Sequence, residues 1–73
     1  MELPRLKYWR LRRGLAQRDL ADVSGVGAST INRIERGLQL ARPLTTRRLA
    51  KALSVEPADL MEAEDEDLGK LAA

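Results

Sequence analysis

Apolar residues recur at intervals of three and four along most of the chain, and no window shows the sustained alternation of apolar and polar residues that marks a strand. Prolines and glycines fall where helices would begin and end. The pattern predicts a first helix that has Pro4 in its first turn and stops at Gly14, then helices over residues 17–24, 28–36 and about 44–53, and a last short helix from Pro57 to Met61. Because the connections are short, we expect a compact all-α fold of five helices.

Charge is divided unevenly along the 73 residues, a length that suits a single domain. Residues 1–55 carry twelve Lys and Arg against four acidic residues, a net charge of +8, whereas residues 56–73 carry Lys70 against seven acidic residues, a net charge of −6. We interpret residues 1–61 as a basic domain and residues 62–73 as an acidic C-terminal tail. A basic domain suggests a polyanion as its partner, although basic residues that only solvate helix faces would give the same balance.

Several classes of function lack the residues that they need. The chain has no cysteine and no histidine, and its serines at 24, 29 and 54 have no visible base partner. We therefore expect no enzyme, no cofactor and no metal site. No apolar run approaches the roughly 20 residues that span a bilayer, and charges interrupt the N-terminal segment where a signal peptide would be apolar. We expect a cytoplasmic protein without a membrane contact.

Two predicted helices each place one charged residue in line with their apolar residues. Arg10 follows Leu6 on the apolar stripe of the first helix, and Glu35 follows Ile31 on that of the 28–36 helix. A lone buried charge is costly, whereas a paired and hydrogen-bonded charge is tolerated. We therefore predict that Arg10 and Glu35 form a structural ion pair. The alternative is that both side chains are solvated at the edges of their stripes, where such a pair contributes about 0–1 kcal/mol.

The opposite side of the 28–36 helix is polar and basic, and it bears no acidic residue. At one continuous helical spacing it carries Ala28, Ser29, Asn32, Arg33 and Arg36. Arginine can bind guanine through two hydrogen bonds, asparagine can bind adenine in the same way, and alanine can contact the methyl group of thymine. This chemistry matches what base edges and phosphates require, so we predict that this side of the helix contacts nucleic acid. The alternative is an ordinary solvent-facing surface, but such surfaces usually carry charges of both signs.

Phosphate contacts are predicted for residues around this face. Gln17 opens the 17–24 helix, where side-chain amide and backbone N–H groups would lie near a phosphate. The other candidates are basic residues, whose charge suits the DNA backbone. The full set is Gln17, Arg18, Arg36, Arg42 and Arg48.

The stretch from Gln17 to Gly37 resembles the phage repressor/Cro-type helix-turn-helix family, also called the xenobiotic-response-element family. The matching residues are Gln17, Leu20, Ala21, Gly25, Val26, Ile31, Ile34, Glu35 and Gly37. The pattern has physical reasons: a small residue is needed where two helices cross closely, and a glycine makes the turn between them. The resemblance extends to about residues 3–61 and leaves out the acidic tail.

The resemblance implies a five-helix, repressor-like DNA-binding domain. It implies that the 28–36 helix enters the major groove while the 17–24 helix crosses the DNA backbone. It also implies the Arg10–Glu35 pair and base contacts at Ala28, Ser29, Asn32 and Arg33. The chain departs from the family where Ala16 and Gly27 replace the usual Ser or Thr caps, so both helix starts are expected to be looser.

We expect a transcriptional regulator that binds double-stranded DNA sequence-specifically. We expect it to act as a repressor that blocks a promoter. One recognition helix offers few base contacts, so we expect a homodimer on a palindromic operator. Val55, Leu60 and Met61 are candidates for the dimer surface, joined by Leu68 and Leu71, although the first three could instead complete the monomer core. The alternative function is an antitoxin or another protein-binding module whose tail docks a partner protein. Residues 62–67 could also compete with phosphate for the basic face.

Overall fold

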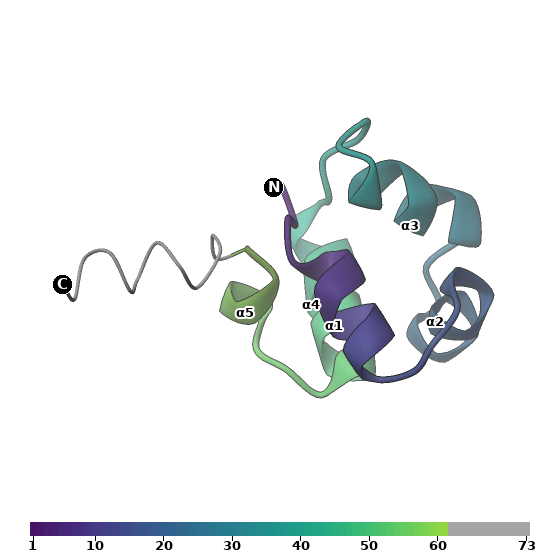
Figure 1. Ribbon diagram of the computed structural model, residues 1–73. Coiled ribbons are helices and arrows are strands. Elements are labelled where there is room, and N and C mark those ends of the chain that lie inside the picture. Colours follow the sequence, from purple (N-terminus) through teal and green to yellow (C-terminus); the bar gives the residue numbers. More distant parts are fainter. Residues whose placement is uncertain (62–73) are drawn as a thin grey trace, which may run out of the picture.

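The computed structural model describes residues 1–61, which form five helices and no strand. The helices are α1 (Leu6–Arg12), α2 (Gln17–Ser24), α3 (Ala28–Glu35), α4 (Pro43–Leu53) and α5 (Pro57–Met61). Figure 1 shows α2 and α3 on one side of the molecule, α5 on the opposite side, and α1 and α4 between them. The predicted all-α fold is confirmed, and the helix bounds fall within two residues of those expected from the sequence.

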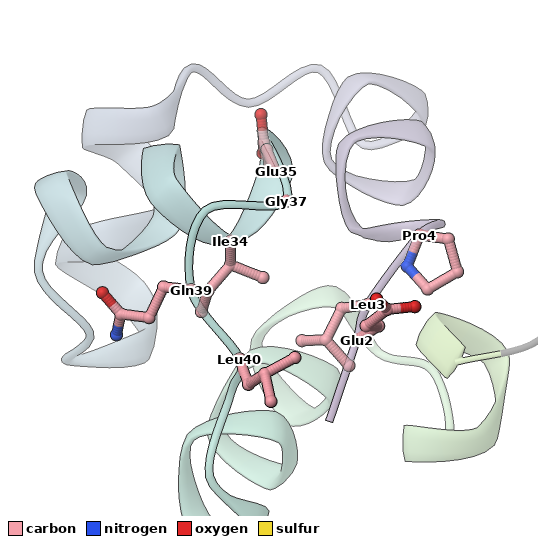
Figure 2. Close-up of a pocket in the computed structure, with 8 residues that line it drawn as sticks. All are labelled: Glu2, Leu3, Pro4, Ile34, Glu35, Gly37, Gln39 and Leu40. Atoms are coloured by element: carbon pink, nitrogen blue, oxygen red, sulfur yellow. The ribbon is translucent and has the colours of Figure 1, made fainter.

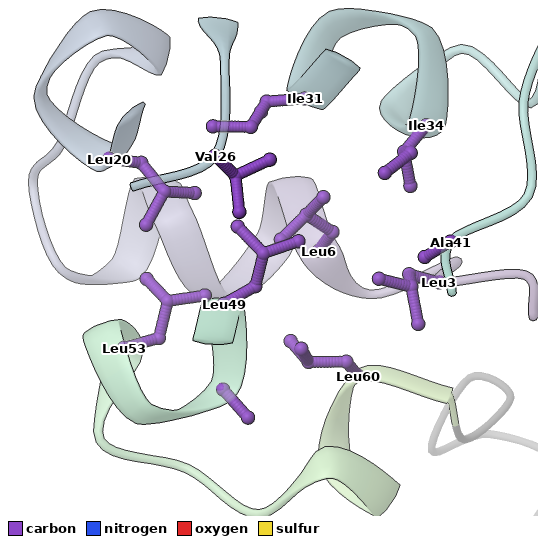
Figure 3. Packing of buried hydrophobic residues seen from close by; sticks show 11 residues of the cluster. Leu3, Leu6, Leu20, Val26, Ile31, Ile34, Ala41, Leu49, Leu53 and Leu60 are labelled. Atoms are coloured by element: carbon purple, nitrogen blue, oxygen red, sulfur yellow. The ribbon is translucent and has the colours of Figure 1, made fainter. Parts of the chain in front are cut away.

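A single core of aliphatic side chains fills the space where the helices meet. Six of these side chains have no exposed area, namely Leu6 from α1, Leu20 from α2, Ile31 from α3, Leu49 and Leu53 from α4, and Leu60 from α5. Figure 3 shows them converging from all five helices. Because full burial of one such side chain contributes about 1.5–3 kcal/mol, this cluster fixes which side of each helix faces inward.

The first helix begins later than the sequence pattern predicts. Pro4 and Arg5 lie in a turn, and α1 begins at Leu6. The backbone N–H of Arg5 donates to the carbonyl of Leu60 in α5 at 3.2 Å. This hydrogen bond ties the segment before α1 to the last helix, so Pro4 belongs to the approach to α1 rather than to its first turn.

The connection between α2 and α3 is a tight turn that sets the angle between the two helices. Gly25 has a φ of +76°, in the left-handed region that a side chain disfavours. The hydroxyl of Ser24 accepts a hydrogen bond from the backbone N–H of Val26 at 3.1 Å, and Val26 is itself buried. The turn therefore holds the first residues of α3 close to α2 without a longer loop.

The start of α2 is better capped than its sequence predicts. Ala16 has no side-chain acceptor, but its backbone N–H donates to the carboxylate of Asp19 at 3.0 Å. This is the return half of a capping box, in which the residue three positions into the helix binds the capping residue's N–H. The expected looseness is therefore wrong for α2, whereas Gly27, the residue before α3, provides no side-chain cap.

The C-terminal helix completes the core instead of offering its leucine to a partner. Leu60 is 0% exposed, so of the two alternatives left open for it the monomer core holds and a dimer surface at Leu60 is wrong, whereas Val55 packs against the core and is only half-buried. Met61 is the one residue of that candidate set that remains well exposed, at 38%. The expectations for residues 62–67, Leu68 and Leu71 lie outside the described residues.

Candidate nucleic-acid interface

Helix α3 has one buried side and one exposed side. Ile31 is 0% exposed and Ile34 is 4% exposed, and both belong to the core. The opposite side exposes Ala28, Ser29, Arg33 and Arg36. Asn32 lies at the boundary and is half-buried. The helix therefore presents to solvent four of the five residues that the sequence pattern placed on its outward side.

This exposed side forms one wall of a shallow depression of about 470 Å³. Its lining comes from α2, from α3 and from the residue that follows Gly37, and it consists of Gln17, Ala28, Ser29, Asn32, Arg33, Arg36 and Leu38. Among residues 1–61, two guanidinium groups line the depression and no carboxylate does. The four predicted base-contact residues therefore share one surface, together with Gln17 and Arg36 from the predicted phosphate contacts.

The remaining predicted phosphate contacts lie outside the depression. Arg18, Arg42 and Arg48 are exposed, on α2, in the α3–α4 connection and on α4 respectively. Their charges are exposed but do not line the depression. Such an arrangement suits a long polyanion, because a DNA backbone passes beyond the groove that a single helix fills.

Arg10 and Glu35 meet between α1 and α3 in the two-pronged contact that arginine and carboxylate favour. Arg10 Nε donates to Glu35 Oε2 at 2.6 Å, and its terminal nitrogen donates to Oε1 at 3.0 Å. The side chains of Arg10 and Glu35 are 8% and 4% exposed, so the pair expected from the sequence is present and buried. The other terminal nitrogen of Arg10 donates to the carbonyl of Leu15 at 2.8 Å. This hydrogen bond ties the α1–α2 loop to the ion pair.

The hydrogen bond to Glu35 raises the pKa of the Arg10 guanidinium above its ordinary value, and this outweighs the opposing effect of burial. Because the pKa of Arg10 is raised in the folded protein, its charged form stabilises the fold fully at any pH below the ordinary pKa. This stabilisation is lost only when the pH rises through the raised pKa. Arg10 therefore stays charged across the pH range in which DNA binding is measured.

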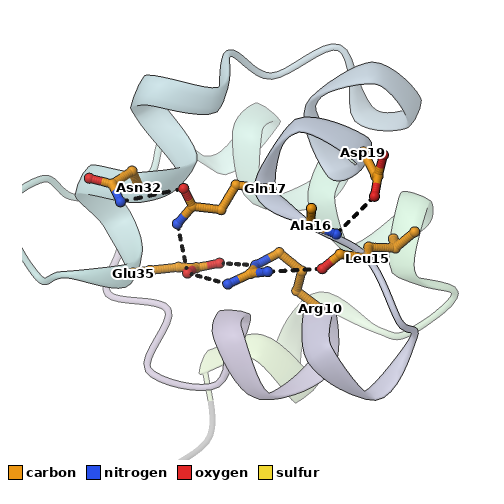
Figure 4. A network of polar contacts seen from close by, with 7 residues as sticks. All are labelled: Arg10, Leu15, Ala16, Gln17, Asp19, Asn32 and Glu35. Carbon is orange, nitrogen blue, oxygen red and sulfur yellow. Dashed lines mark hydrogen bonds and ion pairs between the residues drawn. The ribbon is translucent and has the colours of Figure 1, made fainter.

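Gln17 connects this buried pair to the exposed side of α3. Its Nε2 donates to Glu35 Oε1 at 3.1 Å, and its Oε1 accepts from Asn32 Nδ2 at 3.4 Å. Figure 4 shows the resulting chain of contacts running from Arg10 through Glu35 and Gln17 to Asn32. The sequence placed the Gln17 amide near a phosphate, whereas in the structure both ends of that amide already have partners within the protein.

A second cavity, of about 190 Å³, lies beside the C-terminal end of α3 and faces the N-terminal segment. Figure 2 shows Leu3 and Leu40 on its opposite walls. Glu2 and Glu35 also line it, and no basic residue of the described part of the chain does. A lining with two carboxylates and no cation does not suit a phosphate, so this cavity is separate from the basic depression in both place and chemistry.

Among residues 1–61, no group of three or more acidic side chains is arranged to hold a metal ion. No helix in the same part of the chain is long and apolar enough to cross a bilayer.

Two features of the depression were missed from the sequence. The bridging role of Gln17 requires the distance between α2 and α3, which helical spacing does not contain. Leu38 lines the depression because its backbone N–H donates to the carbonyl of Arg33 at 2.8 Å, which folds the chain back over the end of α3. Gly37, with a φ of +74°, permits this reversal. A glycine directly before Leu38 was the available signal.

A family model described as helix-turn-helix matches residues 6–60, which is most of the chain and includes all five helices except the last residue of α5. Neither a curated protein nor a solved structure matches the chain significantly. The match leaves out the acidic tail, as the resemblance seen in the sequence does.

Proposed function

Because the chain belongs to the Cro/C1-type helix-turn-helix family, the xenobiotic-response-element family of DNA-binding transcription regulators, we propose that it is a sequence-specific repressor that inserts α3 into the major groove of double-stranded DNA. The domain that binds DNA is residues 1–61, and residues 62–73 are an acidic tail. Repression follows from steric occlusion, since a protein seated on a promoter excludes the polymerase.

The observation that carries this proposal is the exposed side of α3. A core helix in so small a domain would be expected to bury most of its surface, yet α3 contributes two isoleucines inward and leaves two arginines outward without an ion pair to residues 1–61. An α-helix fits the major groove of B-DNA, which is about 12 Å wide. The exposed small residues Ala28 and Ser29 at the start of α3 let its backbone approach the groove floor closely.

Each residue of the exposed side has a base chemistry that it suits. Arg33 can bind O6 and N7 of guanine through two hydrogen bonds, and Asn32 can bind N6 and N7 of adenine. Ala28 can contact the methyl group of thymine, and the hydroxyl of Ser29 can donate or accept. Each bidentate contact would contribute about 1–3 kcal/mol of discrimination against a wrong base.

Phosphate contacts complete the interface and fix its register. Arg36 extends the α3 surface, while Arg18, Arg42 and Arg48 are also exposed. Gln17 would contact phosphate through its backbone N–H at the first position of α2, because its side-chain amide is held inside the protein.

We further propose that two copies bind a palindromic operator. Two bidentate contacts from one α3 fall short of the specific affinity that regulators reach, about 10⁻⁸ M or tighter. A two-fold dimer doubles the contacts and places its recognition helices about 34–36 Å apart, one turn of DNA. Sedimentation of the protein with duplexes that carry one or two half-sites would measure the stoichiometry directly.

The proposal is tested by selecting bound duplexes from a random pool and then titrating salt against the best sequence. We expect an enriched, two-fold symmetric sequence, and a log–log plot of affinity against salt with a slope of about −0.9 for each phosphate contact. Recovery of no common sequence, with equal affinity for all duplexes, would contradict sequence-specific binding while leaving nonspecific DNA binding in place.

Repression is a separate step with its own test. A promoter that overlaps the selected sequence is transcribed in vitro with and without the protein, alongside a promoter in which the selected sequence is scrambled. We expect the transcript to fall as the first site fills and to stay constant for the scrambled control. A transcript that rises with occupancy would identify an activator instead.

A further inference from the structure

We propose that Gln17 is a positioning residue that fixes which atoms Asn32 offers to DNA, so that Asn32 selects adenine and rejects guanine. This inference rests on the proposed function, because it concerns the readout made by the exposed side of α3. Its basis is the chain of hydrogen bonds that begins at the buried Arg10–Glu35 pair and ends at Asn32 (Figure 4).

The first step is the orientation of the Gln17 amide. The carboxylate of Glu35 can only accept hydrogen bonds, and it is held in place by two from Arg10, at 2.6 and 3.0 Å. An amide that contacts this carboxylate must therefore turn its nitrogen toward it. Gln17 does so, with Nε2 at 3.1 Å from Glu35 Oε1.

The second step carries this orientation to α3. Because the nitrogen of the Gln17 amide faces Glu35, its oxygen faces Asn32, and that oxygen can only accept. Asn32 must therefore donate through its amide nitrogen, and Nδ2 lies 3.4 Å from Gln17 Oε1. In Figure 4 the oxygen of Asn32 lies on the side of the amide away from Gln17.

The third step is the consequence for a base. With one Nδ2 hydrogen directed at Gln17, Asn32 retains its Oδ1 acceptor and its second Nδ2 hydrogen for the groove. Adenine matches this pair, since N6 donates and N7 accepts. Guanine offers two acceptors, O6 and N7, so one of them would face the Asn32 oxygen without a donor between them. Cytosine, with a single N4 donor, satisfies Oδ1 alone and ranks between the two.

The anchor of this relay is rigid, which is why it can impose a direction. Arg10 and Glu35 are nearly inaccessible to solvent, at 8% and 4% exposed. Gln17 and Asn32 stand on α2 and α3, which the turn at Gly25 holds at a fixed angle. An asparagine without these contacts could rotate its amide by half a turn and offer two donors to guanine instead.

The test uses the full chain and four duplexes that differ only at the base pair that Asn32 reads. That position is located first as the one at which Asn32→Ala removes the preference of the parent protein. We expect the parent to prefer adenine there. Gln17→Ala should reduce the adenine-over-guanine ratio by about tenfold, within the range of one bidentate contact, and should change the other positions by less than about twofold.

Three further variants separate positioning from other roles of Gln17. Gln17→Met keeps the length of the side chain and removes both hydrogen bonds, so it should relax the same position even if the alanine variant folds poorly. Arg18→Ala, an exposed neighbour outside the relay, is the matched control and should weaken all four duplexes by one common factor. Adding Gln17→Ala to Asn32→Ala should change the base ratio no further, because the residue that Gln17 orients is already absent.

The outcomes distinguish this inference from the proposed function. If the parent protein selects no sequence, the proposed function itself fails. If it selects a sequence but prefers guanine at the Asn32 position, or if Gln17→Ala and Gln17→Met weaken all four duplexes equally, the relay is wrong and Gln17 contacts phosphate through its side chain. A position-specific loss in both Gln17 variants, absent from Arg18→Ala, supports the relay.

Discussion

On the inward side of α3, the carboxylate of Glu35 accepts hydrogen bonds from Arg10 and Gln17, whereas on the outward side Arg33 and Arg36 have no ion pair within residues 1–61. Both sides belong to α3, a helix of eight residues, and to Arg36, which caps its C-terminal end. The inward charge has partners within the fold, and the outward charges have none within residues 1–61. The difference teaches that polarity alone does not mark a binding surface, and that the decisive feature is whether the polar groups already have partners.

Asn32 lies between the two sides and shares properties of both. It is half-buried, and one of its amide hydrogens is directed at Gln17 while its oxygen remains available. The comparison between the two sides can be tested by variants that change stability without changing the outward surface, and by variants that do the reverse.

Removing the inward carboxylate should have the largest effect. Glu35→Ala leaves the buried guanidinium of Arg10 without its partner, and loss of one member of a buried ion pair costs about 3–5 kcal/mol. The measurement is the free energy of unfolding from a urea titration that is monitored by circular dichroism. A low temperature keeps the weakened protein folded at zero denaturant. A loss below about 0.5 kcal/mol, the size of a surface substitution, would contradict a buried pair.

The matched control replaces both partners. In Arg10→Met/Glu35→Leu the charges are exchanged for apolar side chains of similar length, and such exchanges are often neutral or stabilising. We therefore expect the double variant to be more stable than Glu35→Ala. If the double variant is as unstable as the single one, packing rather than an unpaired charge explains the loss.

Truncating an apolar residue on the inward side of α3 should have the next largest effect on stability. Ile31→Ala removes a side chain that is 0% exposed, and cavities of this kind cost about 2–5 kcal/mol. Ser29→Ala, on the exposed side of the same helix, should stay within about 0.5 kcal/mol of the parent. Urea titration of both variants gives the contrast, and equal losses would show that the two sides of α3 do not differ in burial.

The fold could be predicted closely because its signals are local. Apolar spacing placed all five helices, and glycines at 25 and 37 marked where α2 and α3 end. The errors arose where one segment contacts another that is distant in sequence. For Leu60 the sequence left a dimer surface and the monomer core as alternatives, because spacing shows that a residue is apolar on its helix without showing what covers it. In the structure the core covers it.

The candidate site could be predicted in part for the same reason. The outward residues of α3 share a helical face, so spacing finds them, and the Arg10–Glu35 pair could be inferred because each charge lies on an apolar stripe. The role of Gln17 could not be inferred, because an amide at the start of α2 is equally suited to phosphate and to a carboxylate. The structure shows the contact with Glu35, at 3.1 Å.

On the outward side, Arg33→Ala should change specificity and leave stability unaltered. Its guanidinium is exposed, so the free energy of unfolding should move by no more than about 0.5 kcal/mol. The free-energy preference for guanine at one base position should fall by about 1–3 kcal/mol, because a bidentate contact with that guanine is lost. Competition binding with single-base variants of the selected duplex measures this. Arg48→Ala is the control, and it should weaken all duplexes alike.

The smallest effect is expected for Arg36, which lies at the end of α3 where the outward side meets the predicted path of the DNA backbone. Arg36→Ala should reduce the magnitude of the salt slope by about 0.9, because one fewer phosphate is neutralised. Arg36→Lys keeps the charge and should keep the slope. The measurement is affinity for the selected duplex at several salt concentrations. If both variants lose base preference at one position while the slope is unchanged, Arg36 reads a base. The outward side of α3 then specifies sequence over its whole length, and the boundary between readout and phosphate contact moves beyond the helix.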